Sequence, residues 1–97
     1  MSYDTNCVYI MASFDNKIIY TGVTNNLLRR VAEHREGNPR TFTGKYKVYK
    51  LVYFECGGDI ISAINREKQI KAISRVNKEK LISSMNPDWK DLAEDWF

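Results

Sequence analysis

Cysteine is scarce in this chain, with two residues in 97. Cys7 and Cys56 each lie in an apolar stretch, without the close spacing or the histidine neighbours of a zinc site, so we expect buried thiols. No apolar run approaches the length that crosses a bilayer, and the N-terminus lacks the basic flank and apolar core of a secretory signal. These absences predict a soluble, cytoplasmic protein that does not associate with membranes.

Several catalytic motifs are also missing. The sequence has no glycine-rich phosphate loop, no HExxH motif and no Gly-x-Ser-x-Gly elbow. It therefore does not fit P-loop nucleotide hydrolases, HExxH metalloproteases or serine hydrolases built around that elbow.

The composition predicts one ordered domain over residues 1–97. Hydrophobic residues make up 43% of the chain, which is enough for one modest core but not for two. The net charge is only +3, yet basic side chains gather between residues 27 and 50 and again between 65 and 80. A solvated charged face is the simpler interpretation of these clusters, and a nucleic-acid surface is the alternative.

Apolar periodicity and turn residues predict an α+β fold of order β-β-α-β-α-α. The expected elements are strands at 7–12 and 18–23, a helix at 27–36, a loop at 38–44, a strand at 46–55, and helices at 60–73 and 75–85. Asp59 and Ser74 suit helix N-caps, and Pro87 ends the last helix. We expect a three-stranded antiparallel sheet with flanking helices.

Glu67 breaks the apolar pattern of its helix. It shares one helical stripe with four apolar residues, namely Ile60, Ala63, Ile64 and Ile70. An ionised carboxylate is costly to bury unless it is paired or bound to a metal. A salt bridge to an arginine, an exposed stripe edge and a metal site are all compatible with this pattern.

Four further side chains are candidates for a catalytic role, although the sequence pattern supports each of them less than it supports Glu67. Tyr9 and Tyr20 lie on neighbouring strands and share a face only if the register allows it. Arg30 and His34 are four residues apart at the border of the apolar face of their helix. Each has an ordinary structural explanation as well, the tyrosines as core aromatics and the other two as boundary residues.

These residues together resemble the signature of GIY-YIG nucleases. Two tripeptides, Cys7-Val8-Tyr9 and Tyr20-Thr21-Gly22, are followed by Arg30 on a helix and by Glu67 on a later helix. The likeness is to small stand-alone bacterial members and to the nuclease domain of the excision-repair incision subunit. The segment from Asn86 to Leu92 is similar to the Asn-Pro-x-Trp-x-Asp-Leu ending of those stand-alone members.

The resemblance implies roles for individual residues. Tyr9, Tyr20 and Arg30 would be catalytic, His34 would help in proton transfer or positioning, and Glu67 would bind a single Mg²⁺ or Mn²⁺ ion. Gly22 would let the backbone approach the nucleic acid. The family's late asparagine would be Asn77 or Asn86, of which Asn86 is preferred.

The sequence departs from the family pattern at three positions. Cys7 stands where the first tripeptide has glycine, and Thr21 stands where the second has isoleucine. Val23 replaces a lysine that the incision subunits carry after the glycine, which removes one phosphate contact.

We therefore expect a metal-dependent DNA endonuclease, structure-selective and active in repair, that is a monomer or a weak homodimer. RNA is an alternative substrate. A non-catalytic nucleic-acid-binding module is the rival interpretation, with Lys45, Lys47 and Lys50 interleaved with tyrosines as a phosphate and stacking surface. A structural or partner-binding domain is a third.

Overall fold

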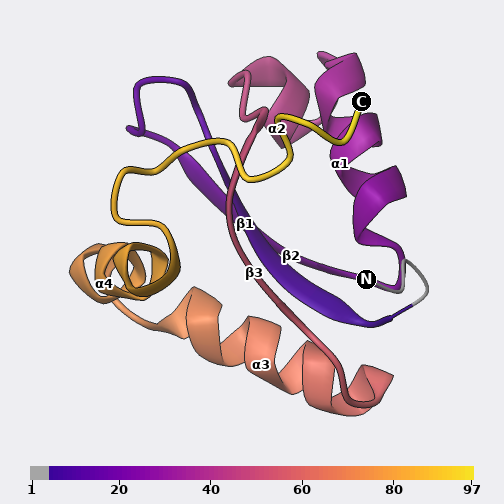
Figure 1. The fold of residues 1–97 in the computed structure, drawn as a ribbon, viewed down its shortest axis with the longest axis vertical. Helices are drawn as coiled ribbons and strands as arrows, with labels where there is room; N and C mark the ends of the chain where they lie inside the picture. The colour runs from indigo at the N-terminus through magenta and orange to yellow at the C-terminus, as the bar shows by residue number, and fades with distance from the viewer. Residues whose placement is uncertain (1–4) are drawn as a thin grey trace.

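The computed structural model describes residues 5–97. Its strands are β1 (Cys7–Ala12), β2 (Ile19–Thr24) and β3 (Lys50–Cys56), and its helices are α1 (Leu27–Glu36), α2 (Phe42–Lys45), α3 (Ile60–Ala72) and α4 (Arg75–Met85). The predicted α+β class and the three-stranded antiparallel sheet are confirmed (Figure 1). Between residues 5 and 97, no helix is long and apolar enough to cross a membrane.

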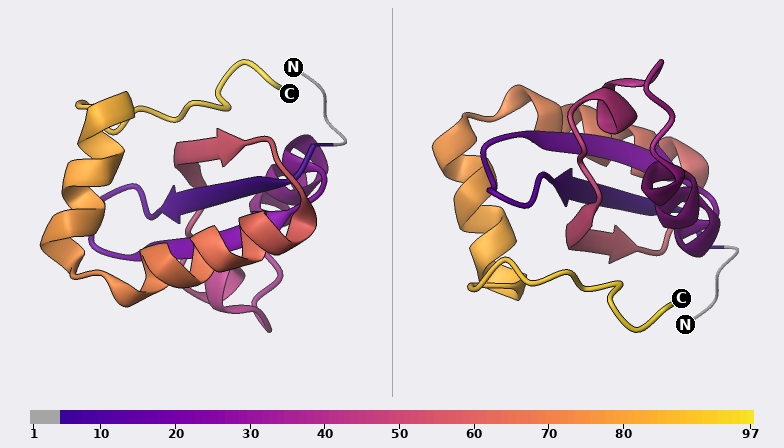
Figure 2. Two further views of the ribbon diagram at one scale, coloured as in Figure 1. Left: turned by 90° about the horizontal axis from the view of Figure 1, so that it is seen from below. Right: turned by 90° about the horizontal axis from the view of Figure 1, so that it is seen from above.

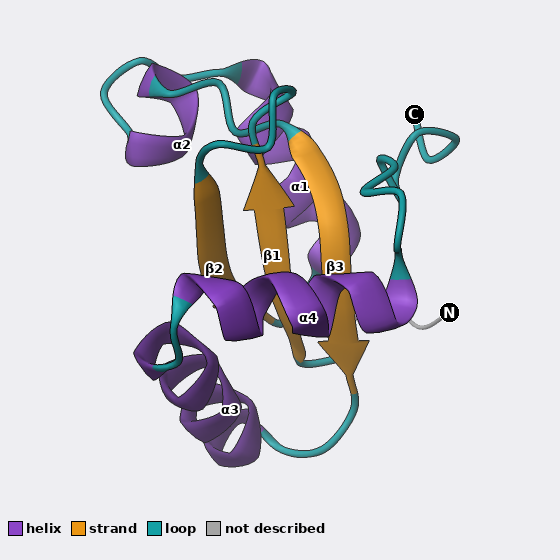
Figure 3. Ribbon diagram, turned by 90° about the vertical axis from the view of Figure 1, so that its left-hand side faces the viewer, coloured by secondary structure: helices purple, strands orange, loops and turns teal. Residues whose placement is uncertain are grey.

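The sheet has the order β2-β1-β3, so β1 is central and both of its neighbours are edge strands. Helix α1 lies on one face of the sheet, and α3 and α4 lie on the other (Figure 3). Because side chains alternate along β1, its odd-numbered residues pack toward α1, and its even-numbered residues pack toward α3 and α4. The two faces therefore have separate cores.

Local signals explain where the helices begin. Asn26, Asp59 and Ser74 cap α1, α3 and α4, and each side chain accepts a hydrogen bond from the backbone N–H three residues on. The predicted helix starts are thus confirmed. The apolar stripe of α3 is narrower than expected, since Ala63 and Ile70 are buried while Ile60 and Ile64 are exposed.

Two predicted boundaries were wrong at the start of the third strand. Residues 42–45 form the short helix α2 where a loop was expected, and β3 begins at Lys50 instead of Tyr46. The reason is local. Tyr46 caps α2, and Lys47 has a φ of 55°, a left-handed conformation that cannot continue a strand.

The prediction of two buried thiols was also wrong. Cys7 and Cys56 are directly opposed on β1 and β3 and form a disulfide. This pairing could not be predicted, because the two residues are 49 positions apart and their register depends on the folded sheet.

The C-terminal segment covers the outer edge of β3 (Figure 2). Leu92 N–H donates to the Leu51 carbonyl, and the Asp91 carboxylate accepts from Leu51 N–H. Asp91 also pairs with Arg35 of α1. An exposed edge strand would be a template for pairing with another chain, so this segment both protects the sheet and secures α1.

Candidate active site

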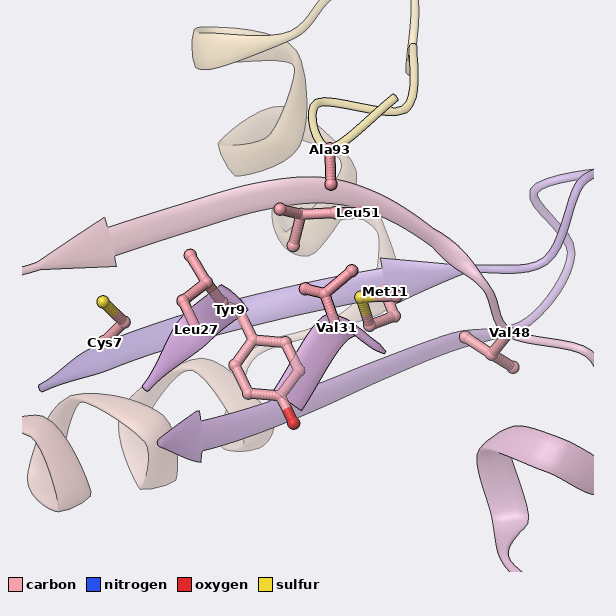
Figure 4. Packing of buried hydrophobic residues seen from close by; sticks show 8 residues of the cluster. All are labelled: Cys7, Tyr9, Met11, Leu27, Val31, Val48, Leu51 and Ala93. Atoms are coloured by element: carbon pink, nitrogen blue, oxygen red, sulfur yellow. The ribbon is translucent and has the colours of Figure 1, made fainter. Parts of the chain in front are cut away.

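Tyr9 lies at the centre of the candidate site. It faces α1 from the central strand, and its register partner on β2 is Gly22. Its ring is 1% exposed, and in Figure 4 the hydroxyl points away from the rest of the core cluster, toward β2. A Cβ atom at Gly22 would lie 2.5 Å from the Tyr9 hydroxyl oxygen. Gly22 is therefore needed to make room for Tyr9, and its close approach to nucleic acid stays a prediction.

Tyr20 shares this face of the sheet. It is paired with Met11, so it lies diagonally from Tyr9 and not opposite it. The two ring centroids are 6.3 Å apart. The predicted meeting of the two tyrosines thus occurs, and the absent side chain of Gly22 leaves the space in which their rings approach.

His34 of α1 contacts both a site residue and the segment after the helix. Its Nε2 atom is 2.9 Å from the Tyr9 hydroxyl, and its Nδ1 atom is 2.9 Å from the Thr43 hydroxyl. Burial lowers the pKa of His34 below its ordinary value, and the nearby Arg30 charge adds to this effect. The imidazole is therefore neutral at pH 7 and able to accept a proton.

Arg30 lies one helical turn before His34 and is half-exposed. Its Nε atom is 3.3 Å from a carboxylate oxygen of Glu33, so the two side chains form an ion pair. That Nε is buried and has no hydrogen-bond partner among residues 5–97. The guanidinium thus keeps donors available for an anion beside the tyrosines.

Glu67 lies on a helix that covers the other face of the sheet. It lies on α3, which packs against β2 and β1, and its side chain is 14% exposed. Its ionic partner is Lys71, with 3.1 Å between Nζ and a carboxylate oxygen. Lys71 is itself half-exposed, so this pair can open toward solvent.

The pKa of Tyr9 reflects this arrangement. Burial raises it above its ordinary value, Tyr20 raises it further, and the positive charge of Arg30 opposes both. The negative charges of Glu67 and Glu33 also raise it. Side chains from β2, α1 and α3 therefore all act electrostatically on one hydroxyl group.

A cavity of about 350 Å³ opens beside these residues. Its walls come from β2, α1 and the following segment, and they consist of Tyr20, Arg30, Glu33, His34, Glu36, Asn38, Thr41, Phe42 and Thr43. Its volume falls in the range of sites for small ligands, so it can admit part of a nucleotide.

The carboxylate of Glu67 fits the binding of a single hydrated divalent ion. Within the described part of the chain, no group of three or more His, Cys, Asp or Glu side chains is arranged to hold a metal. Mg²⁺ keeps several waters and is commonly held by one or two carboxylates together with substrate phosphates. Glu67, which is partly buried but paired only with a half-exposed lysine, suits that mode of binding.

The structure does not bring Asn86 to this group. Its amide donates to the carbonyls of Val52 and Lys90 and accepts from Lys90 N–H, at the β3 edge of the sheet. Val52 lies at a bulge in β3, where the register with β1 shifts, and Asn86 satisfies its carbonyl. The geometry gives Asn86 a structural role, and Asn77 is exposed at the start of α4.

The three predicted phosphate-binding lysines differ in their surroundings. Lys50 donates to the Asn16 side chain in the β1–β2 turn, which holds it against the protein. Lys45 and Lys47 are exposed, and the Lys45 ammonium lies 5.4 Å from the ring centroid of Tyr46. Only Lys45 and Lys47 of this set are free to meet a ligand.

Sequence reasoning missed Thr43, Glu33 and Phe42. All three line the cavity, and Phe42 packs against Tyr20 with 6.2 Å between ring centroids. Glu33 could have been found from its place one turn from Arg30 and beside His34. No pattern pointed to Thr43 or Phe42, because the segment that carries them was predicted to be a loop.

Comparison with known proteins identifies the family. The model of the GIY-YIG catalytic domain matches residues 5–80. This chain belongs to the GIY-YIG family. The match confirms the resemblance seen in the two tripeptides and extends through α3, which carries Glu67.

The chain is similar to several small proteins. A UPF0213 protein of Clostridium perfringens is 42% identical over 79 residues, which are 81% of this chain and 84% of the relative. One from Natronomonas pharaonis is 38% identical over 76 residues, which are 78% and 88% of the two chains. The solution NMR structure of a UPF0213 protein from Bacillus halodurans superposes with a TM-score of 0.57 at 26% identity, covering 94% of this chain and 97% of the other.

Proposed function

We propose that this protein is a metal-dependent endonuclease that hydrolyses DNA phosphodiester bonds. The observation that carries the proposal is the convergence on the Tyr9 hydroxyl. It hydrogen-bonds His34, and the charges of Arg30 and Glu67 act on it from helices on opposite faces of the sheet.

Arg30 would bind the scissile phosphate. A guanidinium presents a planar set of donors that matches phosphate oxygens, and the Arg30 side chain is half-exposed, with the exposed Glu33 as its ion-pair partner. The adjoining cavity, with Tyr20 and Phe42 in its walls, would receive the neighbouring nucleotide.

Glu67 would hold one Mg²⁺ or Mn²⁺ ion, with substrate oxygens and water as the other ligands. Such an ion, when bound, polarises the phosphate and stabilises negative charge on the leaving 3′ oxygen. The approach of a cation to Glu67 requires Lys71 to swing away, and its exposed position allows that movement.

Tyr9 would relay a proton instead of acting as a free phenolate. Its raised pKa makes the phenolate rare at neutral pH, whereas the neutral imidazole of His34 lies within hydrogen-bond distance. Because the Tyr9 hydroxyl is buried, a side chain of the cavity wall would first have to move to admit water. That water would give its proton to Tyr9 as Tyr9 passes its own proton to His34. Tyr20, which lines the cavity, would orient that water.

DNA is the proposed partner, with RNA as the alternative substrate. We propose a structure-selective activity in repair for a cytoplasmic protein acting as a monomer or weak homodimer. Lys45 and Lys47 would add sequence-independent phosphate contacts near the cavity.

A second candidate is a nucleic-acid-binding module without catalysis. Phe42 and Tyr46 are 50% and 41% exposed, their ring centroids are 4.9 Å apart, and Lys45 lies over Tyr46. Exposed aromatic rings beside lysine form a surface on which bases can stack. This candidate predicts salt-sensitive binding that needs neither Glu67 nor a divalent ion.

The test is a cleavage assay on single-stranded, duplex, flap and branched DNA, and on RNA of the same sequence, with Mg²⁺ or Mn²⁺. We expect Glu67→Gln to abolish cutting. Glu79→Gln is the matched control, because Glu79 also forms an i,i+4 ion pair, with Arg75 on α4. Cutting that is unchanged in Glu67→Gln would overturn the proposal, and binding without any cutting would favour the second candidate.

A further inference from the structure

Thr43 contacts the proposed proton acceptor from the side away from Tyr9. Its hydroxyl is 2.9 Å from His34 Nδ1, while the Tyr9 hydroxyl is 2.9 Å from Nε2. The three side chains thus form one row, Tyr9–His34–Thr43, which runs from the central strand through α1 to α2.

The backbone around Thr43 is held firmly in place. The Thr41 side chain caps α2 by accepting from Gly44 N–H, and Val48 N–H donates to the Thr43 carbonyl at 2.8 Å. Gly44 packs directly on the preceding loop, where an added Cβ would lie 1.8 Å from the Asn38 carbonyl oxygen. With its side chain buried, Thr43 has a fixed position relative to His34.

The hydrogen atoms of these three side chains can be arranged in two ways, one for each neutral tautomer of His34. If Nδ1 is protonated, His34 donates to Thr43, and Nε2 accepts from the Tyr9 hydroxyl. If Nε2 is protonated, it donates to Tyr9, and the Tyr9 hydrogen must find another acceptor. Within residues 5–97, His34 is the acceptor within reach of that hydroxyl.

Burial distinguishes the two arrangements. Tyr9 is 1% exposed and is absent from the cavity wall, so an unpaired hydrogen on its hydroxyl would be buried. Thr43 does line the cavity, so its hydroxyl hydrogen can point to solvent while its oxygen accepts from His34. The arrangement with the proton on Nδ1 leaves no buried donor unsatisfied in this row.

We propose that Thr43 is a positioning residue, which accepts from Nδ1–H of neutral His34 and so keeps Nε2 free to receive the Tyr9 proton. Its catalytic consequence rests on the proposed nuclease function. In that reaction a water O–H bond breaks, its proton goes to Tyr9, and the Tyr9 proton goes to Nε2. The water oxygen bonds to phosphorus, the bond from phosphorus to the 3′ oxygen breaks, and that oxygen takes a proton from solvent.

The tautomer can be measured without any substrate. His34 is the single histidine of the chain, so long-range ¹H–¹⁵N NMR correlations report its two nitrogens without overlap. We expect a protonated Nδ1 and an unprotonated Nε2 in the native protein at pH 7.5. Thr43→Val, which keeps the shape but removes the acceptor, should shift the ring toward the Nε2–H tautomer, and Thr43→Ser should restore Nδ1–H.

Cleavage kinetics test the catalytic consequence. We expect Thr43→Val to lower kcat about tenfold or more with KM little changed, and Thr43→Ser to recover most of it. An Nε2–H tautomer in the native protein overturns the inference even if the protein cuts DNA. So does an Nδ1–H tautomer that persists in Thr43→Val. An Nδ1–H tautomer that depends on Thr43 in a protein that cuts nothing upholds the positioning role and removes only the proposed function.

Discussion

Replacing Gly22 by alanine should disrupt the candidate site with a single added methyl group. The new Cβ would lie 2.5 Å from the Tyr9 hydroxyl oxygen, 2.6 Å from Cζ of that ring and 2.9 Å from a ring carbon of Tyr20. Real Cβ atoms do not approach other atoms this closely, so one ring must move. Tyr9 is packed among Met11, Leu27 and Val31, which leaves it little room.

The size of the effect follows from three contributions. Overpacking a well-filled core costs about 1–3 kcal/mol. Loss of the buried hydrogen bond between Tyr9 and His34 costs about 1 kcal/mol. Alanine stabilises a strand by about 0.5–1 kcal/mol relative to glycine, which offsets part of these two losses. The free energy of unfolding should therefore fall by about 1–3.5 kcal/mol.

Urea denaturation followed by circular dichroism measures this change. The control is the same substitution in a Tyr9→Leu background, where the two contacts with the Tyr9 ring are gone and the 2.9 Å contact with Tyr20 remains. There the alanine should cost clearly less than it does in the native chain. A Gly22→Ala protein as stable as the native chain would refute the steric argument. So would an equal loss of stability in both backgrounds.

Two other outcomes are expected. Asn86→Ala should lower the free energy of unfolding by about 2–3 kcal/mol, because it leaves the buried carbonyl of Val52 and two part-buried backbone groups of Lys90 without their partner. Substitution of the exposed Asn77 by alanine should change it by less than about 0.5 kcal/mol. Equal effects of the two substitutions in thermal melts would contradict the structural role of Asn86. The lowered pKa of His34 means that the unfolded chain binds its proton more tightly, so the stability due to neutral His34 is present above pH 6.5 and is lost as the pH falls below it. The urea midpoint should thus drop more steeply from pH 7 to pH 5 in the native protein than in His34→Gln, and parallel curves would show that His34 is not buried as a neutral group.

Much of this fold could be predicted because its signals are local. The caps Asn26, Asp59 and Ser74 mark helix starts through their own side chains, and apolar periodicity marks the strands. The grouping of Tyr9 with Tyr20 could be anticipated, although the sequence did not fix the register that makes them diagonal neighbours.

What could not be predicted depends on register and on contacts distant in sequence. The disulfide of Cys7 and Cys56 needs the pairing of β1 with β3. The bulge at Val52 shifts the register of β3, and Asn86 donates to the Val52 carbonyl there, a structural contact that no sequence pattern indicated. Thr43 acquires its role only because α2 packs beside α1.

We propose that the Tyr9 hydroxyl takes part in phosphodiester cleavage. The most direct test compares substitutions of two buried strand tyrosines. Tyr9→Phe removes that hydroxyl, and Tyr53→Phe removes one that bonds Glu55 away from the site, in the core on the opposite face of the sheet. In single-turnover cleavage of DNA with Mg²⁺ or Mn²⁺, Tyr9→Phe should be slower by roughly 10²–10⁴-fold, while Tyr53→Phe should cut at nearly the native rate. Equal rates for Tyr9→Phe and the native protein would contradict the account.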